Sequence, residues 1–89
     1  MFVYKVYRYD YVDFDQFRAA IVVANDEVQA ARVHPEGGWV INESNYLNKD
    51  GQKVYTNTWS DKVHVKLIGK CLIQDAKPGD VILTEFKAG

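Results

Sequence analysis

The chain has 89 residues, enough for one domain with a thin hydrophobic core and too few for two independent cores. Hydrophobic residues make up 47% of it and charged residues 26%, which excludes a disordered, collagen-like or coiled-coil protein. The net charge of -1 argues against a cationic nucleic-acid clamp and against an acidic DNA mimic, so no direct nucleic-acid binding is expected.

The signals for cellular location favour a reducing cytosol. Cys71 is the only cysteine, so the chain cannot form an intramolecular disulfide of the kind that small secreted domains use. No basic segment leads into an apolar run at the start, and no apolar stretch approaches the length of a membrane span. We therefore expect a cytoplasmic protein without membrane contact.

The first part of the chain predicts two strands joined by a hairpin connection. From Phe2 to Tyr9 the side chains alternate, with Tyr7 and Tyr9 on the face opposite to Tyr4. The run from Phe17 to Ala24 is rich in β-branched residues and alanine, which is typical of a central strand.

A short helix follows. Asp26 with Gln29 three residues later has the spacing of a capping box, and this predicts a helix that continues through His34. Pro35 and the Gly37-Gly38 pair end it. The helix is too short to stand alone, so we expect it to pack as a lid on the sheet.

The rest of the chain predicts further strands separated by turns. The turn signals are Asn48 to Gly51 and Lys77 to Gly79, and Gly69 indicates a β-bulge or a close backbone approach. The expected strands are Trp39 to Ile41, Lys53 to Trp59, Val63 to Ile73 and Val81 to Lys87. The predicted fold is one α+β domain over residues 1–89, a mostly antiparallel sheet of four to six strands with one short helix packed on it.

Three aspartates near the first turn are the candidate metal ligands. Asp10, Asp13 and Asp15 could chelate a hard cation such as calcium or magnesium. Their spacing lacks the alternate ligands, central Gly and distal Glu of an EF-hand loop. A solvated, acidic hairpin tip is therefore the preferred interpretation, because acidic residues keep an aggregation-prone sheet edge soluble.

The sequence contains no recognisable arrangement of catalytic residues. His34 and His64 titrate near neutrality, but neither has a Ser or Cys nucleophile in a recognised setting. His34 in the last turn of the predicted helix is explained by the helix dipole. The Gly37-Gly38 pair lacks the residues of a phosphate loop. We therefore predict no catalytic residues and no cofactor.

Binding without turnover needs only cations for phosphates and aromatic faces for a base. Arg8 and Arg18 flank the predicted hairpin connection and can approach one another. The alternative is that the arginines only solubilise the surface and the tryptophans belong to the core. The candidate ligand-binding residues are Arg8, Arg18, Arg32, His34, Trp39 and Trp59.

An ordered set of segments carries a family resemblance. It consists of Tyr4 and Tyr7 to Tyr11 with Asp13 and Phe14, Ile21 to Ala24, Asp26 to Pro35, Thr58-Trp59, Val63, Val65, Leu67 to Gly69, and Gly79 to Gly89. In these segments the chain resembles small uncharacterised proteins encoded in phage and prophage genomes. The resemblance implies a protein of the host-cell cytoplasm that acts stoichiometrically on bacterial defence.

The sequence leads to three hypotheses about function. The first is a non-catalytic counter-defence inhibitor that binds a bacterial defence protein or sequesters a nucleotide signal. The second is a structural module that self-associates through a sheet edge, and the third is a metal-dependent enzyme that uses Asp10, Asp13 and Asp15. A homo-oligomer suits the first two because the core is thin, and the tail from Phe86 to Gly89 is expected to support stability or the oligomer.

Overall fold

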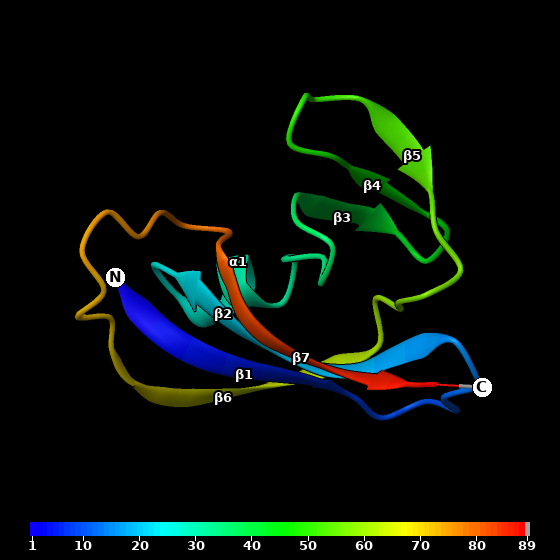
Figure 1. The fold of residues 1–89 in the computed structure, drawn as a ribbon, viewed down its shortest axis with the longest axis horizontal. Coiled ribbons are helices and arrows are strands. Elements are labelled where there is room, and N and C mark those ends of the chain that lie inside the picture. The colour runs from blue at the N-terminus through cyan, green and yellow to red at the C-terminus, as the bar shows by residue number, and fades with distance from the viewer. Residues whose placement is uncertain (89) are drawn as a thin grey trace.

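Residues 1–88, the part of the chain that the structure describes, form seven strands and one helix in the computed structural model (Figure 1). In chain order the elements are β1 (Phe2–Arg8), β2 (Gln16–Ala24), α1 (Glu27–Ala30), β3 (Trp39–Asn42), β4 (Asn45–Leu47), β5 (Lys53–Tyr55), β6 (Val63–Lys70) and β7 (Val81–Lys87).

The larger sheet has four strands in the order β6-β1-β2-β7, and every neighbouring pair is antiparallel. The β1–β2 hairpin occupies its centre, with Phe2 opposite Ala24 at one end and Tyr7 opposite Ala19 at the other. Val22, Val23 and Ala24 are fully buried, as the run of β-branched residues and alanine predicts for a central strand. The mostly antiparallel α+β fold expected from the sequence is confirmed.

The strands in the middle of the chain form a second sheet of their own, in the order β3-β4-β5. The sequence predicts one sheet of four to six strands, and the structure instead divides seven strands between two sheets. These three strands are only three or four residues long and pair with one another. The predicted strand from Lys53 to Trp59 ends at Tyr55, because Thr56 and Thr58 hydrogen-bond to each other in a turn.

The helix begins where the cap predicts but ends early. Asp26 Oδ1 accepts a hydrogen bond from the Gln29 amide at 2.8 Å, and Gln29 Oε1 accepts one from the Asn25 amide at 2.7 Å. α1 spans only Glu27–Ala30, so the expected helix through His34 is wrong. Its next residues turn toward β3, where the Val40 amide donates to a backbone carbonyl of this segment, that of residue 32.

β6 carries the predicted bulge. Its register with β1 shifts at Ile68, next to Gly69. The alternation predicts a strand through Ile73, but β6 ends at Lys70. The apolar residues that follow it therefore lie in a loop.

The core lies on one face of the four-stranded sheet, which we call the inner face. Its sheet residues include Tyr4, Val6, Ala20 and Val22, and α1 and the three-stranded sheet lie on the same side (Figure 1). The rest of the core comes from Ala24, Ala30, Val33, Val40 and Trp59.

The opposite, outer face bears side chains such as Lys5, Tyr7, Ile21 and Leu83, which alternate with the buried ones. Within residues 1–88 no helix or strand packs over it. None of the helical structure in these residues has the length and apolar character needed to cross a membrane.

Candidate functional site

Arg8 ends β1, and all five N–H groups of its guanidinium are hydrogen-bonded. Nε and Nη2 donate hydrogen bonds to the carboxylate of Asp10 at 2.9 and 3.1 Å, and Nη2 also donates to the Tyr11 carbonyl. Nη1 donates to Gln16 Oε1 and to the Phe17 carbonyl. The side chain is only 5% exposed. Arg8 therefore locks the β1–β2 connection, and its guanidinium is not free for a ligand.

The three aspartates of this connection do not form a metal site. Hydrogen bonding from Arg8 lowers the pKa of Asp10, so this carboxylate is held as an anion against the guanidinium. Asp13 Oδ1 accepts a hydrogen bond from the Phe14 amide. Asp15 adopts a left-handed backbone conformation with φ 59°. Among the described residues, no group of three His, Cys, Asp or Glu side chains comes together to hold a metal.

Beside Arg8, the outer face is hollowed where β1 and β2 meet their connecting loop. The hollow has a volume of about 500 Å³. We call it the tyrosine hollow. It is lined by Lys5, Tyr7, Arg8, Tyr9, Asp10, Tyr11, Val12, Arg18, Ala19, Glu85 and Lys87.

Both carboxylates of the tyrosine hollow are already paired. Asp10 is bound by Arg8, and Glu85 lies 3.3 Å from Arg18 Nε. Arg8 and Arg18 therefore line one hollow, and each faces an acidic neighbour. The Arg18–Glu85 pair is exposed, with 49% and 61% of the two side chains accessible, so water competes with it.

The two lysines of the hollow lie over aromatic rings. Lys5 Nζ is 5.6 Å from the centre of the Tyr7 ring. Lys87 Nζ is 4.9 Å from the Phe14 ring centre and donates to the Val12 carbonyl at 3.2 Å. Neither ammonium forms an ion pair with a carboxylate within residues 1–88. The hollow therefore has an excess of two positive charges.

Its tyrosine rings are accessible. Tyr9 and Tyr11 are 61% and 77% exposed. The His64 ring lies between Tyr7 and Tyr9, with centroid distances of 5.4 and 4.7 Å, and so supports both from β6. These rings offer apolar faces beside the two lysines.

The other residues predicted to bind a ligand lie outside the tyrosine hollow. Arg32 donates to the Val40 carbonyl at 3.3 Å, next to β3. Trp59 is 4% exposed and belongs to the core, where its Nε1 has no hydrogen-bond partner among residues 1–88. It lines a smaller hollow of about 260 Å³ that Arg8 also borders. Trp39 packs against Gly79 at the other sheet. The six candidates thus do not converge on one cavity.

His34 is a buried core residue rather than a helix cap. Its Nδ1 accepts the Glu36 amide at 3.0 Å, so the proton of the neutral ring lies on Nε2, which donates to Thr56 Oγ1 at 3.1 Å. Thr58 lies 3.1 Å from Thr56 and donates to Glu36 Oε1, which closes a ring of hydrogen bonds. Burial lowers the pKa of His34 to about 4. At neutral pH it is uncharged and holds no anion.

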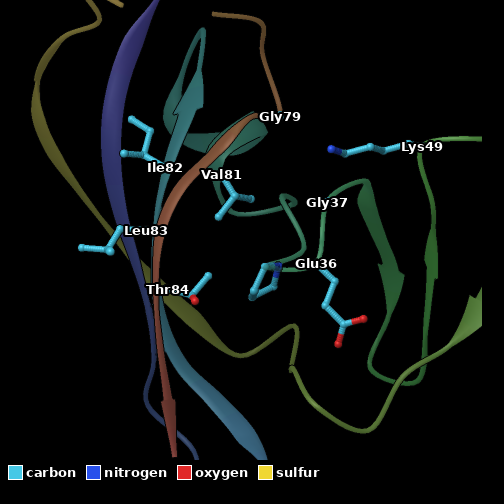
Figure 2. Close-up of a pocket in the computed structure, with 9 residues that line it drawn as sticks. Glu36, Gly37, Lys49, Gly79, Val81, Ile82, Leu83 and Thr84 are labelled. Atoms are coloured by element: carbon cyan, nitrogen blue, oxygen red, sulfur yellow. The ribbon is translucent and has the colours of Figure 1, made fainter.

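A groove of about 460 Å³ runs along the open edge of β7. Figure 2 shows Glu36 and Lys49 opposite the strand, with the Lys49 side chain extended toward Gly79. The Glu36 carboxylate already accepts hydrogen bonds from Thr58 and Tyr46. No sequence candidate lies in the lining of this groove.

Sequence reasoning did not select the lysines and tyrosines of the hollow. The alternation of β1 places Tyr7 and Tyr9 on the face away from the core, and Lys5 shares their parity. That signal could have identified these three. Lys87 is distant in sequence, and only the pairing of β7 with β2 brings it to the hollow.

Comparison with protein-family models, with characterised proteins and with solved structures found no match to this chain. A functional proposal therefore depends on the site geometry alone.

Proposed function

We propose that the protein binds a small anionic ligand of the nucleotide class in the tyrosine hollow and holds it without converting it. In a phage-encoded protein, such binding sequesters a nucleotide signal of host defence. The observation that carries the proposal is that Lys5 and Lys87 lie beside exposed tyrosine rings and form no ion pair with a carboxylate of residues 1–88.

The dimensions and chemistry of the hollow support this ligand class. Pockets for small ligands range from about 300 to 1,000 Å³, and the hollow has about 500 Å³. Ammonium groups bind phosphates, and tyrosine faces stack against a planar base. A nucleotide carries both groups in one molecule.

The state of the carboxylates supports binding without turnover. A general base must be free to take a proton. In the tyrosine hollow the Asp10 carboxylate accepts two hydrogen bonds from Arg8, and the Glu85 carboxylate forms an ion pair with Arg18. Sequestration needs neither of them to react.

Calorimetry tests the proposal. The purified protein is titrated with AMP, with cyclic mononucleotides and with linear and cyclic dinucleotides. We expect at least one to bind, and we expect the Lys5→Gln/Lys87→Gln variant to lose at least tenfold in affinity. The matched control is Lys53→Gln/Lys70→Gln, because these exposed lysines lie outside the hollow. Bound ligand is then recovered by chromatography and is expected to be unchanged.

Two outcomes contradict the proposal. Flat titrations throughout, with binding to a purified defence protein instead, favour a protein target. Conversion of a nucleotide over many cycles, lost in a point variant, makes the protein an enzyme.

A second candidate function is self-association at the β6 edge. Apolar side chains are exposed along and just after this strand: Leu67 is 51%, Ile68 57%, Leu72 91% and Ile73 53% exposed. Exposed apolar groups of this kind beside an open strand edge favour pairing with another chain. Native mass spectrometry tests this function. A dimer that Leu67→Lys/Leu72→Lys converts to monomer supports it, and a strictly monomeric wild-type protein rules it out.

A further inference from the structure

A further hollow, of about 590 Å³, lies between two turns that are distant in sequence. One turn spans residues 77–80 and precedes β7, and the other spans residues 48–51 and joins β4 to β5. The Trp39 side chain of β3 also lines this hollow, which shares no residue with the tyrosine hollow. We call it the tryptophan hollow.

The first turn is fixed by hydrogen bonds. The Lys77 amide donates to Asp80 Oδ2 at 2.8 Å, and the Asp80 amide donates back to the Lys77 carbonyl at 3.0 Å. The Gly79 amide donates to the Val23 carbonyl at 2.8 Å, which ties the turn to β2. The backbone that carries Lys77 is therefore held in place before any ligand arrives.

The second turn is fixed in a similar way. Asn48 Oδ1 accepts the amides of Asp50 and Gln52 at 3.0 and 2.9 Å, and the Asn48 carbonyl accepts the Gly51 amide at 3.0 Å. Lys49 extends from this turn beside Gly37, with its side chain directed toward Gly79 in Figure 2, and it lines both the groove along β7 and the tryptophan hollow. The two turns thus bring one lysine each to the same hollow.

The tryptophan ring has a fixed position as well. Gly79 has φ +98°, and a Cβ at this position would lie 2.9 Å from Trp39 Cζ2. The turn backbone therefore packs directly against the ring edge, an approach that only glycine permits. The half-buried ring packs against the core and also forms a wall of the hollow.

The charges in the lining favour an anion. Within residues 1–88 the side chains of Lys49 and Lys77 form no ion pair with a carboxylate. The lining contains one carboxylate, that of Asp80, and it already accepts the Lys77 amide. Two ammonium groups near one ring attract a negatively charged group, and the ring face attracts a planar one.

We propose that the tryptophan hollow is a second binding site, for a planar ring that carries an anionic group. The ring stacks against Trp39, and the phosphate or carboxylate lies between Lys49 and Lys77. This site goes beyond the proposed function, because it uses different residues and a different part of the fold.

The chain offers a direct optical test. It has two tryptophans, so Trp59→Phe leaves Trp39 as the only indole fluorophore. The probes are AMP and phenyl phosphate as ring phosphates, benzoate as a ring carboxylate, adenosine and benzamide as uncharged counterparts, and inorganic phosphate as an anion without a ring. We expect saturable quenching by a ring-bearing anion at concentrations at least tenfold lower than for its uncharged counterpart or for phosphate.

Lysine variants locate the site. Lys49→Gln/Lys77→Gln is expected to weaken the effect at least tenfold, whereas the matched control Lys53→Gln/Lys62→Gln leaves it unchanged. Lys5→Gln/Lys87→Gln is also expected to leave it unchanged, so failure of this site and failure of the tyrosine hollow are distinguishable. Response to AMP and phenyl phosphate alone identifies a phosphorylated ligand, and response to benzoate alone identifies an aromatic carboxylate; both support the site.

Trp59 is a core residue, so Trp59→Phe could unfold the protein. In that case the indole N–H signals of Trp39 and Trp59 are followed by NMR in the wild-type protein. A selective, saturable shift of the Trp39 signal is expected. The proposal is overturned by the lack of any saturable response to the three ring anions, or by a response that Lys49→Gln/Lys77→Gln leaves intact.

Discussion

The imidazole of His34 lies flat against the phenol ring of Tyr46, with 3.8 Å between ring centres and 14° between ring planes. His34 is fully buried, and it joins the segment after α1 to β4 through this stack and to the segment after β5 through Thr56. The neutral ring is therefore part of what attaches the three-stranded sheet to the rest of the molecule.

Acid should weaken this attachment. The pKa of His34 falls from an ordinary 6.5 to about 4 in the folded protein, because burial disfavours the charged ring. Between these two values the unfolded chain binds a proton that the folded chain does not, so stability falls as pH falls and levels off below about 4. We expect this residue to account for a loss on the order of 3 kcal/mol between pH 7 and pH 4. Urea unfolding across this pH range measures it.

The control for this prediction is His64, which is exposed. His64→Gln should keep the pH dependence, and His34→Gln should flatten it. Should His34→Gln not fold, NMR titration of the wild-type imidazole signals gives the pKa directly. A His34 pKa near 6.5 would contradict the prediction.

Arg8 and Arg18 should differ sharply on conservative substitution. Lysine has one nitrogen with three donors, so Arg8→Lys leaves buried acceptors without a partner, and we expect a loss of about 2 to 3 kcal/mol. Arg18→Lys should change stability by less than about 0.5 kcal/mol, because its ion pair with Glu85 is exposed. Chemical unfolding of both variants checks this. Equal losses would show that the hydrogen bonds of Arg8 do not stabilise the loop.

Two glycines with similar backbone angles should respond differently to alanine. Gly38 and Gly51 have φ +90° and +78°. A Cβ on Gly38 would overlap the Leu47 carbonyl oxygen, whereas a Cβ on Gly51 meets nothing within 4 Å. Gly51→Ala should cost about 1 kcal/mol for the left-handed backbone alone, and Gly38→Ala at least about 2 kcal/mol more. Similar melting temperatures for the two variants would contradict this.

Phe86 should stabilise the end of the sheet. Its ring meets Phe17 edge to face, with 4.9 Å between centres, and it is 45% exposed. Phe86→Ala should therefore cost about 1 to 2 kcal/mol. Val28→Ala is the control, because Val28 is 75% exposed and should matter by less than about 0.5 kcal/mol. Thermal unfolding compares them. Gly89, the last residue of the tail expected to matter, lies outside the described residues.

Local signals in the sequence predicted local structure well. The period-two pattern of β1, the β-branched run of β2 and the cap at Asp26 all lie where the structure has them. The helix end was not predictable from the cap, because the residues after Ala30 gain backbone bonds to β3 that compete with another helical turn. The division into two sheets arises because β3, β4 and β5 pair with one another while β6 and β7 pair with the distant β1 and β2, and alternation does not encode which strands pair.

For the candidate site, too, local sequence signals predicted only local structure. The approach of Arg8 to Arg18 is a hairpin property, and the sequence predicted it. The Arg8 guanidinium makes five hydrogen bonds within the protein. Three of them go to Gln16 and to backbone carbonyls, and no pattern in the composition identifies these acceptors. Trp59 and His34 were predicted to bind a ligand because of their residue types, but both side chains are buried in the protein interior.

The pairing of β2 with β7 and of β1 with β6 joins segments roughly sixty residues apart. A nascent chain leaving the ribosome therefore has the central hairpin long before the two strands that flank it, and the hairpin edges stay open until β6 and β7 have also been synthesised. Small domains dominated by such distant pairings fold in roughly milliseconds to seconds, far more slowly than helical bundles. During this interval a chaperone, or another copy, can reach the edges that β6 and β7 later cover.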